Sequence, residues 1–354
     1  MDGEEAFELC SELIDLLQRA RRFDDVEALI GRVESTCPEA AESEAGYFAL
    51  WRAENEVLGG RGRELAAVVA LGKHLAKVGD LADKLVDRLR FHGRADLLEA
   101  MLEVAWPLIR DDDDLMGWVK DEVMNTLIDL ILARHLARKR DLRADDPALL
   151  ADLARSVPEL EKPASAILPF LPAPDRSWSR AEVLRAVDQG KDEDEDEDEE
   201  QEQNVLHGLV IEFAYVLQSR GWTPLRSYMA RSAMYNLVMS GLESNRRRAL
   251  ANTTSLLVPE VDSLRAHVLG QQAFLGIKGY IQVAIVLALP RWVEFLVERE
   301  LVDADKTKAT LRNFFREPSE VHQRLAGWLK EEMDPAALAE VGATFRAGGA
   351  PAKG

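Results

Sequence analysis

Six histidines are the residues of this chain best suited to acid–base or metal chemistry, and they are scattered along it. No two stand four residues apart, the spacing that places two imidazoles on one helix face to bind zinc. They are His74, His92, His135, His207, His267 and His322. The chain also lacks the HExxH, GxxxxGKS/T, GxGxxG, GxSxG and paired CxxC motifs. We therefore predict no catalytic, cofactor-binding or metal-binding residues. The absence of these motifs argues against an enzyme. It does not exclude one, because a helical enzyme can assemble its site from distant residues.

Four adjacent aspartates, Asp111 to Asp114, precede a long helix expected over 116–139. Carboxylates at a helix start interact favourably with the positive end of the helix dipole, which makes capping the simpler interpretation. Such a cluster can also collect a divalent cation through its oxygens. However, it lacks the glycine and the distal glutamate of a helix-loop-helix calcium loop.

Two basic clusters are candidate partner-binding residues. Arg134 and Arg138 lie near the end of the 116–139 helix, where cations favour the helix dipole or could meet an acidic partner. Arg246, Arg247 and Arg248 form the strongest basic cluster, at the expected start of a helix over 246–257. No glycine-rich phosphate loop or aromatic stacking pattern accompanies them, so a solvated helix start is favoured over nucleic-acid contact.

Nine consecutive acidic residues divide the chain, and adjacent carboxylates repel one another. They are Asp192, Glu193, Asp194, Glu195, Asp196, Glu197, Asp198, Glu199 and Glu200. We expect this run to be an extended, solvated and disordered linker. It is either a solubilising spacer or a segment that docks on a basic surface by charge, with strong salt dependence.

The overall charge and the cysteine content restrict the possible partners and location. The formal net charge is −19, and removing the ten acidic residues of 192–202 leaves −9, which disfavours general binding to nucleic acid or anionic membranes. Cys10 and Cys37 are too few for a disulfide framework, and the acidic start does not resemble a secretory signal. The longest apolar stretch, 281–290, is too short to span a bilayer. We expect a cytoplasmic protein without membrane insertion.

The first half of the chain shows helical periodicity and no alternating strand pattern. Apolar residues with helical spacing predict one helix over 7–17. A second is expected from Phe23 to Thr36, where Pro38 prevents its continuation. Further helices are expected over 45–58, 64–78 and 81–91.

This helical hairpin resembles a tetratricopeptide-type repeat over residues 7–40. In that family a large apolar residue opens the second helix and a proline closes a unit of about 34 residues, as Phe23 and Pro38 do here. Leu13 and Leu17 take the packing positions of the first helix. An echo near 95–102, 72 residues after Phe23, fits two such units. The resemblance implies stacked helix pairs with a concave protein-binding surface, on which exposed aromatics such as Trp51 and Trp106 are the expected contacts.

The second half predicts a helical bundle. Its central buried helix is expected over 280–301, because that stretch is apolar on more than one side, with Pro290 kinking or splitting it. Asp146-Pro147, Thr223-Pro224 and Asp334-Pro335 are helix starts.

Together these patterns predict an all-α protein with a helical-repeat domain (1–157), a proline-rich and acidic linker (158–204), a C-terminal helical domain (205–346) and a flexible tail (347–354). The expected function is a non-enzymatic scaffold or adaptor that binds a protein partner, with the acidic linker modulating access. One alternative is an enzyme or small-ligand receptor with a pocket among the C-terminal helices. The other is an acidic mimic that binds a basic protein.

Overall fold

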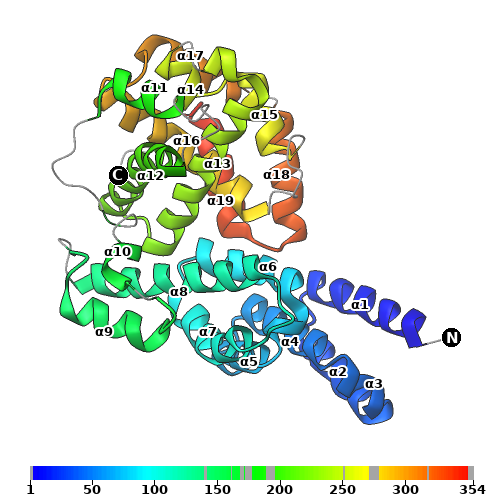
Figure 1. The fold of residues 1–354 in the computed structure, drawn as a ribbon. Coiled ribbons are helices and arrows are strands. Elements are labelled where there is room, and N and C mark those ends of the chain that lie inside the picture. Colours follow the sequence, from blue (N-terminus) through cyan, green and yellow to red (C-terminus); the bar gives the residue numbers. More distant parts are fainter. Residues whose placement is uncertain are drawn as a thin grey trace. The chain divides into compact units, whose positions relative to one another are not determined.

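The computed structural model describes residues 3–138, 142–160, 162–167, 171, 178–188, 196–249, 252–270, 279–316 and 319–349. The chain is 80% helical, and no strand occurs among these residues, which confirms the predicted all-α class. It forms two compact units (Figure 1). The first comprises residues 1–90 and 94–131, and the second comprises residues 91–93 and 132–354. The first unit ends at Ile131, within a helix. The domain boundary expected at residue 157 stays a prediction.

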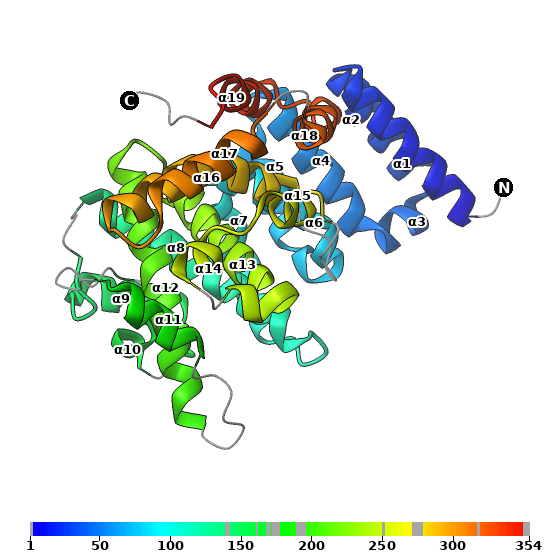
Figure 2. The same ribbon diagram turned by 90° about the horizontal axis from the view of Figure 1, so that it is seen from above.

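In the described part of the first unit, the chain folds into helices α1 to α7 and the start of α8. They are α1 (Gly3–Arg19), α2 (Phe23–Thr36), α3 (Pro38–Ser43), α4 (Ala45–Gly59), α5 (Glu64–Gly72), α6 (Leu75–Phe91, of which Phe91 belongs to the second unit), α7 (Ala95–Arg110) and the start of α8 (Gly117–Arg138). Helix α1 packs on α2 and α4, α4 packs on α5, and α5 packs on α7 (Figure 2). At Gly72 an added Cβ would lie 2.5 Å from the Met101 carbonyl oxygen, so glycine permits the close approach of α5 and α7.

The predicted helix over 64–78 is interrupted. Helix α5 ends at Gly72, and α6 begins at Leu75 with a kink at Gly79, whose φ and ψ are 26° and −109°. Only glycine adopts such a conformation readily, because any Cβ would be strained there. Pro38 ends α2 as predicted and also starts α3, where its missing N–H has no helical partner to lose.

The second unit is organised around one buried helix, α16 (Gly279–Glu298). The other helices are α9 (Pro147–Ser156), α10 (Pro163–Ile167), α11 (Arg180–Asp188), α12 (Asp196–Ser219), α13 (Pro224–Ala249), α14 (Thr253–Leu257), α15 (Val261–Val268), α17 (Ala304–Phe314), α18 (Glu320–Glu331) and α19 (Pro335–Arg346). Helices α12, α13, α15, α17, α18 and α19 all pack against α16. The prediction of a central buried helix is confirmed, since Phe213, Trp292 and Phe295 form an aromatic cluster in the core around it.

Pro290 does not split α16, which continues through it to Glu298. Of the two predicted outcomes, the split is therefore wrong, and the kink stays a prediction. Tertiary packing explains the difference, because Leu289 before Pro290 and Trp292 after it are fully buried, and that burial outweighs the lost backbone hydrogen bond.

The acidic run is helical in its second half, because α12 begins at Asp196. The expectation of an extended backbone is therefore wrong for residues 196–200, and residues 192–195 lie outside the described part of the chain. Carboxylates favour the positive end of a helix, and the apolar face that starts at Leu206 anchors this one in the core. In the expected tail, residues 350–354 also lie outside the described residues.

Candidate protein-binding surface

Helix α1 uses one face to join the core of the first unit. Ile14 is 1% exposed and packs with Val26, Ile30 and Phe48. Phe7 stacks on Trp51 with ring centroids 5.2 Å apart. The half-buried Cys10 and Leu17 complete this inner face. Burial raises the pKa of the Cys10 thiol, because the charged thiolate is disfavoured away from water.

A different face of α1 carries a row of exposed leucines. Leu9, Leu13 and Leu16 have 54%, 44% and 62% of their surface exposed. Their spacings of four and three residues place them side by side along one face of the helix. We refer to Leu9, Leu13 and Leu16 as the leucine row. Single exposed leucines need no explanation, but apolar side chains aligned along one helix are the pattern by which an amphipathic helix meets a partner.

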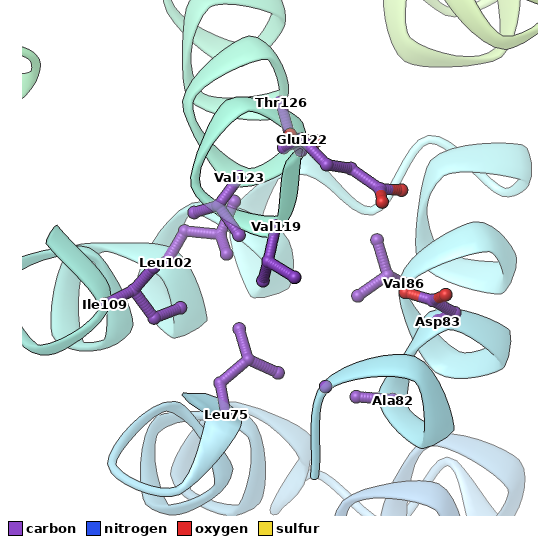
Figure 3. Close-up of a pocket in the computed structure, with 11 residues that line it drawn as sticks. Leu75, Ala82, Asp83, Val86, Leu102, Ile109, Val119, Glu122, Val123 and Thr126 are labelled. Atoms are coloured by element: carbon purple, nitrogen blue, oxygen red, sulfur yellow. Dashed lines mark hydrogen bonds between the residues drawn. The ribbon is translucent and has the colours of Figure 1, made fainter. Parts of the chain in front are cut away.

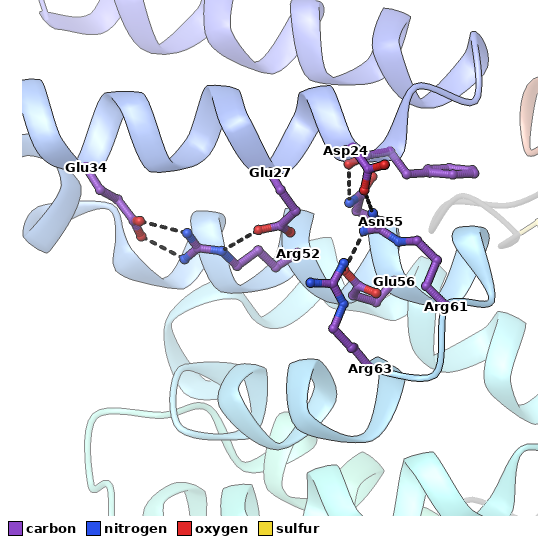
Figure 4. A network of polar contacts seen from close by, with 9 residues as sticks. Asp24, Glu27, Glu34, Arg52, Asn55, Glu56, Arg61 and Arg63 are labelled. Atoms are coloured by element: carbon purple, nitrogen blue, oxygen red, sulfur yellow. Dashed lines mark hydrogen bonds and ion pairs between the residues drawn. The ribbon is translucent and has the colours of Figure 1, made fainter.

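The alignment of α2 with α4 is held by Arg52. Its two terminal nitrogens each donate to Glu34, at 2.7 Å to Oε1 and 2.7 Å to Oε2, while its Nε lies 3.4 Å from Glu27 Oε2 (Figure 4). The hydrogen bond from Arg52 lowers the pKa of Glu34. A bidentate pair fixes orientation as well as distance, so α4 is held in register against α2.

A second set of polar contacts lies at the start of α2. The Asn55 side-chain amide is buried and donates to the Phe23 carbonyl at 3.0 Å. Arg61 contacts Asp24 and donates to the buried Glu56 at 2.5 Å (Figure 4). These contacts hold α2 and α4 together, and α1, which carries the leucine row, packs on both helices.

The first unit also contains a small pocket between α6, α7 and α8 (Figure 3). Its cavity volume is about 50 Å³. Its floor is apolar, with Leu75, Leu102 and Val119, and the carboxylates of Asp83 and Glu122 lie on one side. A benzene-sized ligand occupies an apolar cavity of about 150 Å³. This pocket therefore suits a few water molecules rather than a substrate.

One buried carboxylate among the described residues of the second unit has a strongly lowered pKa. Asp334 is 3% exposed and caps α19 by accepting from the Ala337 amide at 3.0 Å. Its Oδ2 also accepts from Tyr280 Oη at 2.9 Å and lies 2.5 Å from His92 Nε2. Burial raises the pKa of Asp334, but the hydrogen bonds from His92, Ala337 and Tyr280 outweigh it and bring this pKa to about 2. These contacts cap α19 and join it to Tyr280 and His92, which is a structural role.

The two tryptophans expected on an exposed groove are buried. Trp51 is 8% exposed and Trp106 is 5% exposed. Trp51 packs against Phe7 and Phe48 within the core of the first unit. The expectation that these indoles are exposed is therefore wrong, because large aromatic surfaces stabilise a helical core most when water is removed from them.

Of the predicted arginines, the structure describes the side chains of Arg134 and Arg138, both near the end of α8. Arg134 donates to Asp152 at 3.0 Å, and His135 Nε2 contacts the same carboxylate at 2.9 Å. Arg138 is exposed at the end of α8. Residues 246–248 form the last turns of α13 rather than a helix start, and their side chains lie outside what the structure describes.

The aspartate cluster forms the turn between α7 and α8. Asp111 pairs with Arg110, with Nε to Oδ1 at 2.7 Å, and Asp112 Oδ1 accepts from the Asp114 amide at 3.0 Å. In the described part of the chain, no group of three or more histidine, cysteine, aspartate or glutamate side chains could hold a metal ion.

No family model, curated protein or solved structure matches this chain. The resemblance to tetratricopeptide repeats therefore stays a prediction, and one of its positions differs. Leu13, expected to pack inside the hairpin, is 44% exposed, and its neighbour Ile14 is buried instead.

By length and composition, α16 is the one helix within the described ranges that could cross a membrane. Since 72% of its qualifying stretch is buried inside the protein, this is weak evidence for a membrane span.

The leucine row was missed by reasoning from the sequence. The available signal is the number of apolar residues in 7–17, which exceeds what one narrow helix face can bury. Such an excess indicates either that the buried face of the helix is wide or that some apolar residues lie on a second face exposed to solvent. Only the packing of α1 against its neighbours distinguishes these two cases.

Proposed function

We propose that this chain is a non-enzymatic protein-binding module and that the leucine row of α1 is its binding surface. The observation that carries this proposal is the alignment of three largely exposed leucines along one face of a helix whose other face is buried in the core. Covering such a surface is favourable by about 25 cal/mol for each Å² of apolar area removed from water. A helix of a partner protein laid along α1 would cover it.

The braced helices beneath α1 support the same proposal. Because Arg52 and Asn55 hold α4 against α2, the surface that supports α1 is ordered before a partner arrives. A pre-organised surface loses less conformational entropy on binding than a flexible one. The scaffold or adaptor role, the cytoplasmic location and the modulating effect of the acidic linker remain parts of this proposal.

Site-specific photo-crosslinking tests the proposal. A photoreactive amino acid would replace Leu13 in full-length protein, and a matched control would carry it at Leu65, an isolated leucine on α5 that is 54% exposed. After irradiation in native extract, we expect one protein crosslinked stoichiometrically at position 13 and none at position 65. Equal crosslinking at both positions, or none at position 13, would refute the proposal.

A further inference from the structure

The exposed charges beside the leucine row are mostly acidic. Glu8 and Glu12 are exposed on α1, one residue before Leu9 and Leu13 respectively. Among the described residues, no cation forms an ion pair with either of them. Further along, Arg19, the single basic residue of this helix, forms an ion pair with Asp15 at 2.8 Å. Its positive charge is therefore neutralised by Asp15 and not by Glu8 or Glu12. One edge of the row therefore carries negative charge along its first two turns.

We infer that the partner segment is an amphipathic helix with lysine or arginine residues flanking its apolar face. This inference rests on the proposed function and specifies the chemistry of the partner. The apolar row supplies the contact area, while opposite charges at its edge select the partner and fix its register. From Leu9 to Leu16 the row extends about 10 Å, at 1.5 Å per residue, so it matches apolar residues at i, i+3 or i+4, and i+7 of the bound helix.

The same charges disfavour two other occupants. In an antiparallel pair of α1 helices centred near Leu13, Glu12 of one copy would meet Glu12 of the other. Like charges that face each other at these flanking positions are destabilising. An anionic membrane surface is disfavoured as well, because it attracts lysine and arginine rather than glutamate.

Two synthetic helical peptides of about three turns would test the inference. Both carry leucines at i, i+4 and i+7, one with lysines and the other with glutamates at the flanking positions. Binding to full-length protein would be measured by fluorescence anisotropy. We expect the lysine peptide to bind at least about tenfold more tightly, with the difference shrinking near 1 M salt, where the screening length is about 3 Å.

Three variants distinguish binding on α1 from binding by the acidic run elsewhere in the chain. Leu13→Gln should abolish binding of the lysine peptide, and the matched control Leu65→Gln should leave it unchanged. Glu8→Lys combined with Glu12→Lys should reverse the preference towards the glutamate peptide. Persistent binding of the lysine peptide by Leu13→Gln would overturn the inference, because it would place the contact elsewhere.

Two further outcomes separate this inference from the proposed function. If both peptides bind equally and Leu13→Gln abolishes both, the surface binds helices without charge selection, and only the inference fails. If the protein alone dimerises with concentration, and Leu13→Gln prevents this, the occupant is a second copy and the inference is again overturned. If neither peptide binds and the protein stays monomeric, the inference fails, while the crosslinking experiment decides the proposed function independently.

Discussion

Replacing Asp334 by asparagine is expected to destabilise the second unit in a pH-dependent manner. Asparagine can still cap α19, so the change mainly removes the negative charge that interacts with His92 and Tyr280. The pKa of Asp334 is lowered from 3.8 to about 2 in the folded protein. Since one pKa unit corresponds to about 1.4 kcal/mol, the charged form contributes about 2 kcal/mol to folding at neutral pH.

The sign of the pH dependence follows from the lowered pKa. A carboxylate whose folded pKa lies below its unfolded value stabilises the protein fully above the unfolded pKa, and the stabilisation is lost as pH falls through the folded value. The stability difference between wild type and Asp334→Asn should therefore be largest near pH 7. It should decline mainly between about pH 4 and pH 2, with about half of it left at pH 3.

Urea unfolding at about pH 7, 4 and 3 would measure this difference, and hydrogen exchange of peptides from α19 would localise it. The matched control is Asp303→Asn. Asp303 also caps a helix, because its carboxylate accepts from the amides of Asp305 and Lys306. Its side chain is exposed, and no histidine or tyrosine among the described residues forms a hydrogen bond with it. We expect a clearly smaller effect there. An equal loss in both variants, or a difference at Asp334 that does not change with pH, would refute the role assigned to the buried charge.

Three more predictions concern packing. Ile14→Ala should cost about 3 kcal/mol of unfolding free energy by leaving a cavity, whereas Leu13→Ala should change it by no more than about 0.5 kcal/mol, and urea denaturation of both variants compares the two faces of α1. Cys37 should react with a thiol reagent faster than Cys10, whose pKa is raised by burial, and the two rates should converge in denaturant, as followed by mass spectrometry of the intact protein. Gly279→Ala should destabilise by about 1 to 3 kcal/mol in thermal unfolding, because its Cβ would lie 2.2 Å from the tryptophan ring on α18, and an unchanged melting temperature would show that this ring moves aside freely.

Local chemistry made several helix ends predictable from sequence. Asp146 and Pro147 start α9 as expected, with the Asp146 carboxylate accepting from two backbone amides. Asp334 and Pro335 likewise start α19, with the Asp334 carboxylate accepting from the Ala337 amide. Such signals are reliable because a cap acts within about four residues of itself, so distant parts of the chain hardly alter it.

The site depends on choices that local patterns leave open. The sequence shows that 7–17 is apolar and helical, but not that Ile14 faces the core while Leu13 faces solvent. That choice depends on the rotation of α1 against α2 and α4, which the packing of all three helices decides together. A turn of about 100° per residue is enough to exchange the two side chains between core and water.

What the sequence by itself determined is the all-α class, most helix positions and the central place of α16, because periodicity and capping are properties of short segments. Tertiary structure alone decided which aromatics are buried, which leucines are exposed, and that His92 meets Asp334 across 242 residues. These features depend on contacts between segments far apart in the chain. No local pattern encodes them, because the free energy of burying a side chain is set by the neighbours that the whole fold brings to it.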